Sequence, residues 1–255
     1  MIRSIPWRPK LKAFGTHLVI SALVFAVIIA LTVWLWYPPP FFWIDGGVQI
    51  TLLAASVDII AGPLLTLVVY RPGKPRLVMN LAVIAAVQFG ALAWGVRVLY
   101  HERPVLMAFI GYNQNRFFPV TAWQAASGER TVDELRALSS ENPPMVFIDL
   151  PANPEEAKNL LTSSTTSVLR HTERFKKIDE ERLAQIVRGA RTRKIYEVIS
   201  PAYVEGIDRF VAAHGGNAEQ FAFIPVYGRF GAALVALSRK DGRLEGVVAK
   251  QMRLR

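Results

Sequence analysis

The chain contains no cysteine, which excludes disulfide bonds, cysteine-ligated zinc, cysteine-bound iron–sulfur clusters and thiol catalysis. Acidic residues are also scarce, because 20 Asp and Glu stand against 30 Lys and Arg in 255 residues. The excess of positive charge is shared equally between residues 1–102 and 103–255, so it does not form a single basic block. A nucleic-acid groove clusters Lys and Arg with stacking aromatic residues. We therefore expect no nucleic-acid partner.

The sequence also lacks the motifs of common catalytic and nucleotide-binding sites. No G-x-S-x-G elbow, Walker loop, G-x-G-x-x-G fingerprint or H-E-x-x-H pair is present. The four histidines are dispersed, and none has the spacing of metal ligands. We therefore expect no enzyme activity, no bound metal and no cofactor.

Long apolar runs are what the sequence does have. Hydrophobic residues make up 52% of the chain, and the excess lies before residue 101. Three runs, at about 18–37, 49–70 and 77–99, have the length of ~20 residues that crosses a bilayer core. The first run ends in aromatic residues and three prolines rather than a small-residue cleavage site, so we interpret it as a retained span.

The charges of the loops predict the orientation of these spans. Residues 1–16 and the turn from Arg71 to Arg76 are basic, whereas Pro38 to Val48 holds a single acid. Loops rich in Lys and Arg stay in the cytoplasm. The prediction is a basic cytoplasmic N-terminus, a three-helix transmembrane region over 17–100, and residues 101–255 in the periplasm of a Gram-negative cell.

Residues 101–255 predict a small α+β domain, large enough for its own core. Thr131 and Glu134 have the spacing of a helical capping box. Lys240-Asp241-Gly242 predicts a hairpin with a type I′ turn. Strands are expected near 105–110, 117–122, 145–150, 221–227, 232–238 and 243–249, with a turn at 111–116, and helices are expected at 131–139, from 154, at 180–190 and from 201 to the glycines at 215 and 216.

Three polar or irregular positions inside the spans are the candidate site. Asp58 and Gln88 lie ~14 Å and ~17 Å from the outer ends of their spans. Asp58 either contacts a polar group of a partner helix, moves a proton, or, protonated or paired with Gln88, holds the spans together. Pro63 removes the helical donor to the Ile59 carbonyl and predicts a kink, used for packing or for a partner.

The chain resembles the TfpX/TfpZ-type type IV pilin accessory proteins, well over about its first 105 residues and in layout beyond them. The matching residues are Leu11-Lys12-Ala13-Phe14-Gly15 with His17-Leu18, Trp36-Tyr37-Pro38, Asp58 with Gly62-Pro63-Leu64-Leu65-Thr66, Pro72-Gly73-Lys74, and Gln88 with Arg103-Pro104-Val105.

The resemblance implies an inner-membrane, chaperone-like accessory protein that assists assembly of its cognate major pilin into type IV pili, without catalysis. The implied partners are the major pilin, inner-membrane lipids and other pilus assembly proteins. Our hypothesis is that Asp58, Pro63 and Gln88 contact the pilin's apolar helix while the periplasmic domain touches the pilin head. The alternative is a membrane sensor or regulator with a periplasmic ligand-binding domain, although the cytoplasmic parts are too short for an output module. A membrane-anchored enzyme is a third class.

Overall fold

The computed structural model describes residues 7–111, 115–163 and 165–252, and they divide into two compact units. The helical unit comprises Trp7–Trp36 and Gly47–Tyr100. The α/β unit comprises Tyr37–Gly46 and the described residues from His101 onward. Three apolar helices followed by a small mixed α/β domain confirm the fold class that the sequence predicts.

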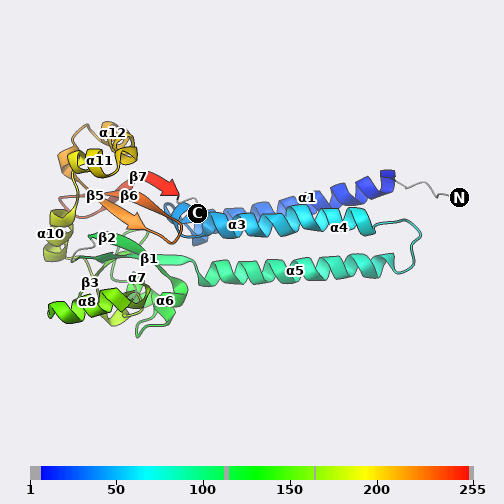
Figure 1. The fold of residues 1–255 in the computed structure, drawn as a ribbon, viewed down its shortest axis with the longest axis horizontal. Helices are drawn as coiled ribbons and strands as arrows, with labels where there is room; N and C mark the ends of the chain where they lie inside the picture. Colours follow the sequence, from blue (N-terminus) through cyan, green and yellow to red (C-terminus); the bar gives the residue numbers. More distant parts are fainter. Residues whose placement is uncertain (1–6, 112–114, 164, 253–255) are drawn as a thin grey trace. The chain divides into compact units, whose positions relative to one another are not determined.

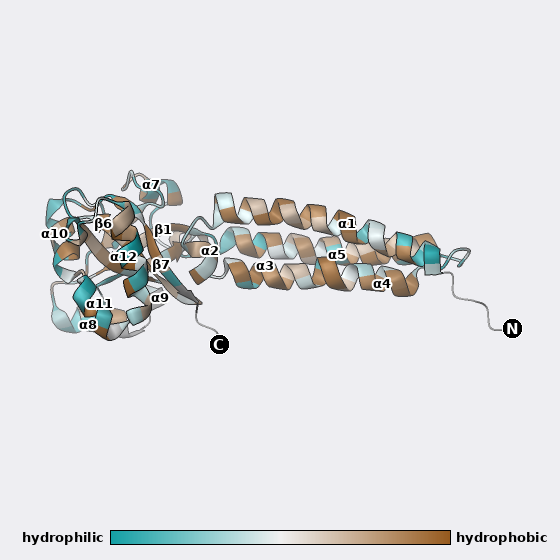
Figure 2. Ribbon diagram, turned by 90° about the horizontal axis from the view of Figure 1, so that it is seen from above, coloured by the Kyte–Doolittle hydropathy of each residue, from teal (hydrophilic) through white to brown (hydrophobic). Residues whose placement is uncertain are grey.

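The helical unit holds three helices that are long and apolar enough to cross a membrane: Trp7–Trp36, Gly47–Val69 and Leu77–His101. Large apolar side chains are exposed along all three, and Figure 2 shows the corresponding bands of hydrophobic residues. Hydrocarbon can solvate such side chains, so their exposure fits a membrane. The elements in chain order are α1 (Trp7–Leu31), η1 (Thr32–Trp36), α3 (Gly47–Ala55), η2 (Ser56–Ala61), α4 (Gly62–Val69) and α5 (Leu77–His101).

The first helix begins at Trp7, well before the expected start of its apolar run. Arg and Lys favour helix as strongly as most apolar residues do, so the basic segment continues the same helix. Pro9 lies in the first turn, where a missing N–H costs no hydrogen bond. The apolar run that the sequence shows marks only the part of this helix that fits hydrocarbon, and the helix extends beyond it toward the N-terminus.

The second span is irregular just before its proline. Residues Ser56–Ala61 form a π-helical turn, and the Gly62 N–H donates to the Val57 carbonyl, five residues back. Pro63 then follows as one of the first residues of α4, a position where its missing N–H costs little. The kink at Pro63 stays a prediction, whereas the π-turn before the proline is a feature often found at functional sites.

The α/β unit is built on a seven-stranded mixed sheet with the order β4-β3-β1-β2-β5-β6-β7. Strand β1 pairs parallel with β3, and β2 pairs parallel with β5, while the other neighbours are antiparallel. The strands, visible in Figure 1, are β1 (Pro104–Ile110), β2 (Arg116–Thr121), β3 (Met145–Ile148), β4 (Phe175–Lys176), β5 (Phe221–Tyr227), β6 (Gly231–Ser238) and β7 (Leu244–Met252).

Two apolar clusters form the core of this unit. One lies where β1 and β3 meet the helices that follow them, and the other lies where β5 and β6 meet the last two helices. Gly206 lets α12 approach β7, because a Cβ there would lie 2.8 Å from the Val248 carbonyl oxygen. The helices are α6 (Ala122–Ala126), α7 (Val132–Arg136), α8 (Pro154–Ser163), α9 (Thr165–Val168), α10 (Glu180–Gly189), α11 (Arg193–Ile199) and α12 (Val204–Ala213), with short 3₁₀ turns η3 (Thr172–Arg174), η4 (Pro201–Tyr203) and η5 (Ala218–Gln220).

Local signals in the sequence predicted most of these elements. The capping box of Thr131 and Glu134 is confirmed. The type I′ turn is wrong, because such a turn needs positive φ at two central residues and only Gly242 has it, at 73°. Instead Ser238 and Arg243 face each other across a four-residue loop, in which the Ser238 N–H donates to the Arg243 carbonyl. Of the turn predicted at 111–116, residues 112–114 lie outside the described residues.

The segment between the first two spans, expected as a simple loop, is part of the α/β unit. It contains a short helix, α2 (Phe41–Ile44), that packs on β6 and β7. The Phe230 N–H donates to the Ile44 carbonyl over 2.8 Å. A Cβ at Gly228 would lie 2.3 Å from the same oxygen, so only glycine fits there. The Lys250 ammonium lies 3.6 Å from the centre of the Trp43 ring.

Candidate functional site

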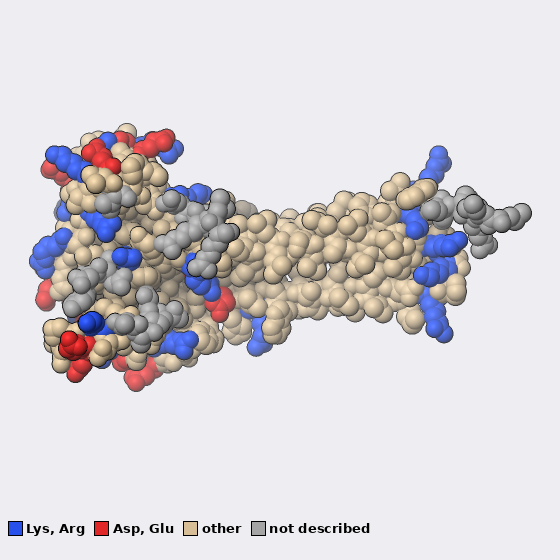
Figure 3. Space-filling model, in the orientation of Figure 1, with Lys and Arg blue, Asp and Glu red and all other residues tan. Residues whose placement is uncertain are grey.

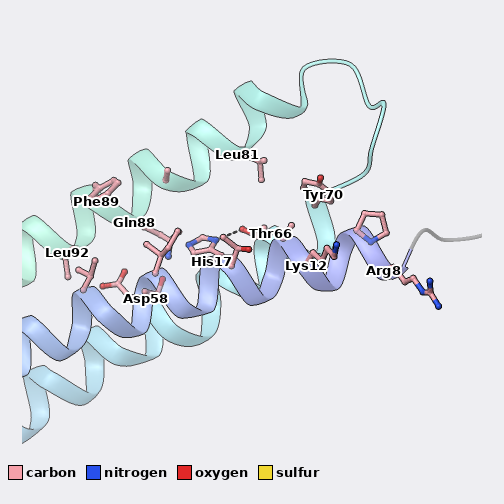
Figure 4. A pocket seen from close by; sticks show the side chains of 17 residues that line it. Arg8, Lys12, His17, Asp58, Thr66, Tyr70, Leu81, Gln88, Phe89 and Leu92 are labelled. Atoms are coloured by element: carbon pink, nitrogen blue, oxygen red, sulfur yellow. Dashed lines mark hydrogen bonds between the residues drawn. The ribbon is translucent and has the colours of Figure 1, made fainter.

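The helical unit contains a cavity of about 870 Å³ lined by α1, η2, α4 and α5. Figure 4 shows polar side chains from all three spans in its central part. The lining residues are Arg8, Pro9, Lys12, Ala13, Thr16, His17, Ile20, Ser21, Val24, Asp58, Thr66, Tyr70, Leu81, Ala85, Gln88, Phe89 and Leu92. Two of the three residues singled out from the sequence, Asp58 and Gln88, are therefore in one site.

Asp58 is the acid of this cavity. It lies in the π-turn η2, and its side chain is 8% exposed. Within the described part of the chain its carboxyl group takes part in no hydrogen bond or ion pair, although the charge of His17 on α1 acts on it. A carboxylate left in this state inside hydrocarbon is expensive, and such residues face the interior of a helix bundle and mark functional sites.

His17 and Thr66 form the polar contact that joins α1 to α4. The His17 Nδ1 lies 2.6 Å from the Thr66 Oγ1, as the dashed line in Figure 4 marks. Nearer the start of α1, the Lys10 ammonium donates to the Val68 carbonyl over 3.3 Å. These contacts fix α1 against α4 without using Asp58, which leaves its carboxyl group open to the cavity.

Gln88 reaches into the same space from α5. Its side-chain amide packs against Gly62, where a Cβ would lie 1.9 Å from Nε2, so the glycine makes room for it. Its Oε1 is buried and has no hydrogen-bond partner among the described residues. A hydrogen bond between Asp58 and Gln88, one of the alternatives that the sequence left open, does not form between these two described side chains.

Pro63 is buried, but it is not among the residues that line the cavity. It shapes the site indirectly, because the π-turn that precedes it contains Asp58. Asp58, Gly62 and Thr66 follow one another at intervals of four residues and are all buried. The proline and the glycine thus help to place the acid and the threonine on one face of the span.

The cavity combines one acid and one histidine with a buried acceptor that has no hydrogen bond among the described residues. Asp58 is the single acid between residues 47 and 100, so no second carboxylate on these spans can share a proton with it. No cluster of three or more potential metal ligands occurs in the described residues. Asp58 and the Gln88 carbonyl instead present two acceptors without donors, an arrangement that favours a ligand carrying a hydrogen-bond donor.

A second buried acid, Asp45, lies in the α/β unit and is bound through Oδ1, while its Oδ2 is buried without a hydrogen-bond partner among the described residues. The backbone N–H and the Nε of Arg229 both donate to its Oδ1, over 3.1 Å and 3.2 Å. The guanidinium also donates to the Asp45 carbonyl over 3.0 Å and to Glu102 Oε2 over 2.6 Å. Burial raises the pKa of Asp45, and the charge of Arg229 opposes this shift. This cluster fixes the segment 37–46 to the loop between β5 and β6.

The sequence did not predict His17 or Thr66 as part of the site. The spacing of Thr66 from Asp58, two helical turns, was a visible signal on one span. The His17–Thr66 contact joins residues 49 positions apart on different helices, and no local pattern indicates such a pairing. The role of Asp45 was also missed, because its partner Arg229 lies 184 residues away.

Comparisons with known proteins identify a family model and several relatives of this chain. A family model described as Fimbrial assembly protein FimB matches residues 5–46. A Dichelobacter nodosus protein named Fimbrial assembly protein, serogroups C1 and C2, is 31% identical over 100 residues, which are 38% of this chain and 76% of that protein. The chain belongs to the fimbrial assembly protein family.

Two further relatives in this family are longer. The Dichelobacter nodosus fimbrial assembly proteins of serogroups I and E1 are 31% and 30% identical over 100 residues, or 38% of this chain. The match spans only 39% of the length of each. No solved structure matches the chain. The names of these relatives describe the assembly of fimbriae and not a chemical reaction.

Proposed function

We propose that this chain is an inner-membrane accessory protein that assists assembly of a major pilin into type IV fimbriae, in the manner of the TfpX/TfpZ-type proteins. Membership in the fimbrial assembly family supports a role in fimbria assembly. The observation that carries the mechanism is the buried acid Asp58, which faces a cavity among three apolar helices without a hydrogen bond or ion pair among the described residues. A chaperone-like protein needs a binding surface of this kind.

The orientation that we propose follows from the charges at one end of the helices. Lys and Arg gather at the end of the helical unit where the turn between α4 and α5 lies, and no acid stands among them (Figure 3). Basic loops remain cytoplasmic, so this end would face the cytoplasm. The α/β unit would then lie in the periplasm, where the globular heads of membrane-bound pilins also lie.

We assign the pilin contact to the cavity face of the helical unit, with Asp58 and Gln88 as acceptors and Pro63 shaping the second span. An apolar helix that carries a hydrogen-bond donor would satisfy both acceptors. Helix α5 would have to move aside to admit the pilin helix, and it can do so because it buries little of its surface. Its contacts with the other spans include Gln88 on Gly62 and the edge-to-face pair of Trp36 and Tyr100.

In-membrane crosslinking tests this proposal. A photoreactive residue at Leu92, which lines the cavity, should capture a co-expressed major pilin. The matched control is Val87 on the same helix, which is 66% exposed and does not line the cavity. Capture from Leu92 but not Val87 is the expected result, and Asp58→Asn should reduce it while the protein stays inserted. Equal capture from both positions, or none from Leu92, would contradict the proposal.

The alternative of a membrane sensor with a periplasmic ligand-binding domain stays a prediction from the sequence. It has no support in the names of the relatives, all of which refer to fimbrial assembly.

A further inference from the structure

The cavity has a basic mouth that the pilin proposal does not use. Arg8 and Lys12 both line it and stand four residues apart on α1, so they lie on one face of that helix. Tyr70, the last residue before the basic turn, lines the same end, as Figure 4 shows. Both basic side chains are exposed, and neither has an ion-pair partner within the described residues.

Charge and apolar surface are separated along the length of the cavity. His17 lies five residues beyond Lys12, and Asp58 lies two turns of its span beyond Thr66, the partner of His17. The acid is therefore about 20 Å from the basic mouth at 1.5 Å per residue. Apolar side chains dominate the walls between and beyond these groups, and they are Ile20, Val24, Leu81, Ala85, Phe89 and Leu92.

The dimensions of the cavity suit a single amphipathic molecule. From Arg8 to Val24 the lining of α1 extends about 24 Å. The cavity holds about 870 Å³, within the range of about 300–1,000 Å³ that is typical of small-molecule sites.

A phospholipid matches both the length and the charge pattern. One leaflet with its headgroups is about 20–22 Å thick, close to the length of the cavity. We propose that the cavity binds one anionic phospholipid, with its phosphate at Arg8 and Lys12 and an acyl chain between α1 and α5. This site rests on the cavity alone and not on the pilin proposal, although a pilin helix entering the same space would displace the lipid.

Lipid retention by the full-length protein, purified in mild detergent without any pilin, tests this site. Native mass spectrometry after titration with phosphatidylglycerol should show one retained lipid. The double variant Arg8→Ala/Lys12→Ala should weaken binding about 30-fold, because each basic residue near an anionic group contributes about fivefold. The matched control is Arg71→Ala/Lys74→Ala, which removes two charges from the same end that do not line the cavity. Equal weakening by both pairs would overturn the proposal.

A second pair of variants tests the apolar part while keeping the charges. Ala85→Phe fills the cavity and should reduce retention of phosphatidylglycerol, whereas Val87→Phe on the outer face of α5 should not. Phosphatidylcholine, which has no net charge, should bind more weakly to the unmodified protein. Glycerol phosphate that binds as tightly as the whole lipid, or retention unchanged by Ala85→Phe, would overturn the assignment to a lipid. Because no pilin is present, none of these results depends on the pilin contact.

Discussion

The molecule buries two aspartates, one in each unit, and treats them in opposite ways. Asp45 in the α/β unit is 2% exposed and accepts from the backbone and the guanidinium of Arg229. Asp58 in the helical unit is 8% exposed and has no hydrogen-bond partner within the described residues. The first acid has its counter-charge supplied by its own chain. The second has no hydrogen bond or ion pair among the described residues, and only the charge of His17 on α1 acts on it, which is why we interpret it as a group held for a partner.

The two environments make this difference more pronounced. A carboxylate in an aqueous domain recovers part of its desolvation cost when a charged donor lies against it. Hydrocarbon provides no water to share that cost, so an unpaired acid among apolar helices persists at the expense of stability. Breaking the Asp45 cluster should therefore destabilise the protein, whereas removing Asp58 should not.

The largest effect is expected for Arg229→Met. This change leaves Asp45 buried without its counter-charge, which typically costs about 3–5 kcal/mol. The guanidinium side chain is 43% exposed, so water compensates in part, and we expect a loss near the lower limit, about 3 kcal/mol. Urea denaturation of the full chain in detergent, followed by near-ultraviolet circular dichroism, measures it.

Arg209→Met is the matched control. Arg209 pairs with Glu205 one helical turn away, and the two side chains are 75% and 81% exposed. Such a pair contributes at most about 0.5 kcal/mol. If both methionine variants lost equal stability, the Asp45 cluster would be no more than a surface ion pair.

Asp58→Leu should have the opposite sign. Removing an unpaired acid from hydrocarbon relieves a cost of about 2–3 kcal/mol, so we expect the helical unit to gain about 2 kcal/mol. Unfolding of the helices by sodium dodecyl sulfate, monitored by far-ultraviolet circular dichroism, measures the change. The stability of Asp58→Asn should lie between that of the wild type and that of Asp58→Leu. A loss of stability in Asp58→Leu would show instead that the acid holds the spans together.

Glycine substitutions compare the packing of the two units. Gly206→Ala should cost about 1–2 kcal/mol, because the new methyl group meets the Val248 carbonyl and the Ala249 side chain at 2.8 Å, and overpacked backbone contacts yield poorly. Gly62→Ala should cost less than about 1 kcal/mol, because the group it meets is the flexible end of Gln88, which can rotate into the cavity. The same two denaturation assays measure both. Equal costs would mean that Gln88 is fixed as firmly as the β7 backbone.

The sequence predicted those parts of the fold that depend on local signals. Three runs of bilayer length gave the spans, and Gly215 and Gly216, with φ of 91° and 78°, end α12 as expected. The capping box at Thr131 needs only a spacing of three residues. The turn chemistry was predicted wrongly, because the hairpin after β6 adopts a four-residue loop rather than a type I′ turn.

Contacts between distant residues explain what the sequence did not reveal. The sequence placed Asp58 and Gln88 in one site because they lie at similar distances from the outer ends of two antiparallel spans, and such residues lie at the same depth. The same reasoning could not show that the pair stays unbonded, since this depends on how far α5 stands from the second span. Nor could it show that Arg229 meets Asp45 from 184 residues away, because either residue alone is typical of a surface loop.

The last prediction is that Asp45 makes the free energy of unfolding depend on pH in the direction opposite to that of an ordinary ion-paired carboxylate. Burial raises the pKa of Asp45 above its usual 3.8, so above pH 3.8 the unfolded chain loses this proton first. The native state then binds more protons, and this group's contribution to stability falls as pH rises, by up to about 1.4 kcal/mol per pH unit, until the raised pKa is passed. The free energy of unfolding of wild type minus that of Asp45→Asn should therefore decrease from pH 4 upward. A difference that increases over that range would show that Arg229 outweighs burial and holds the pKa of Asp45 below its usual value.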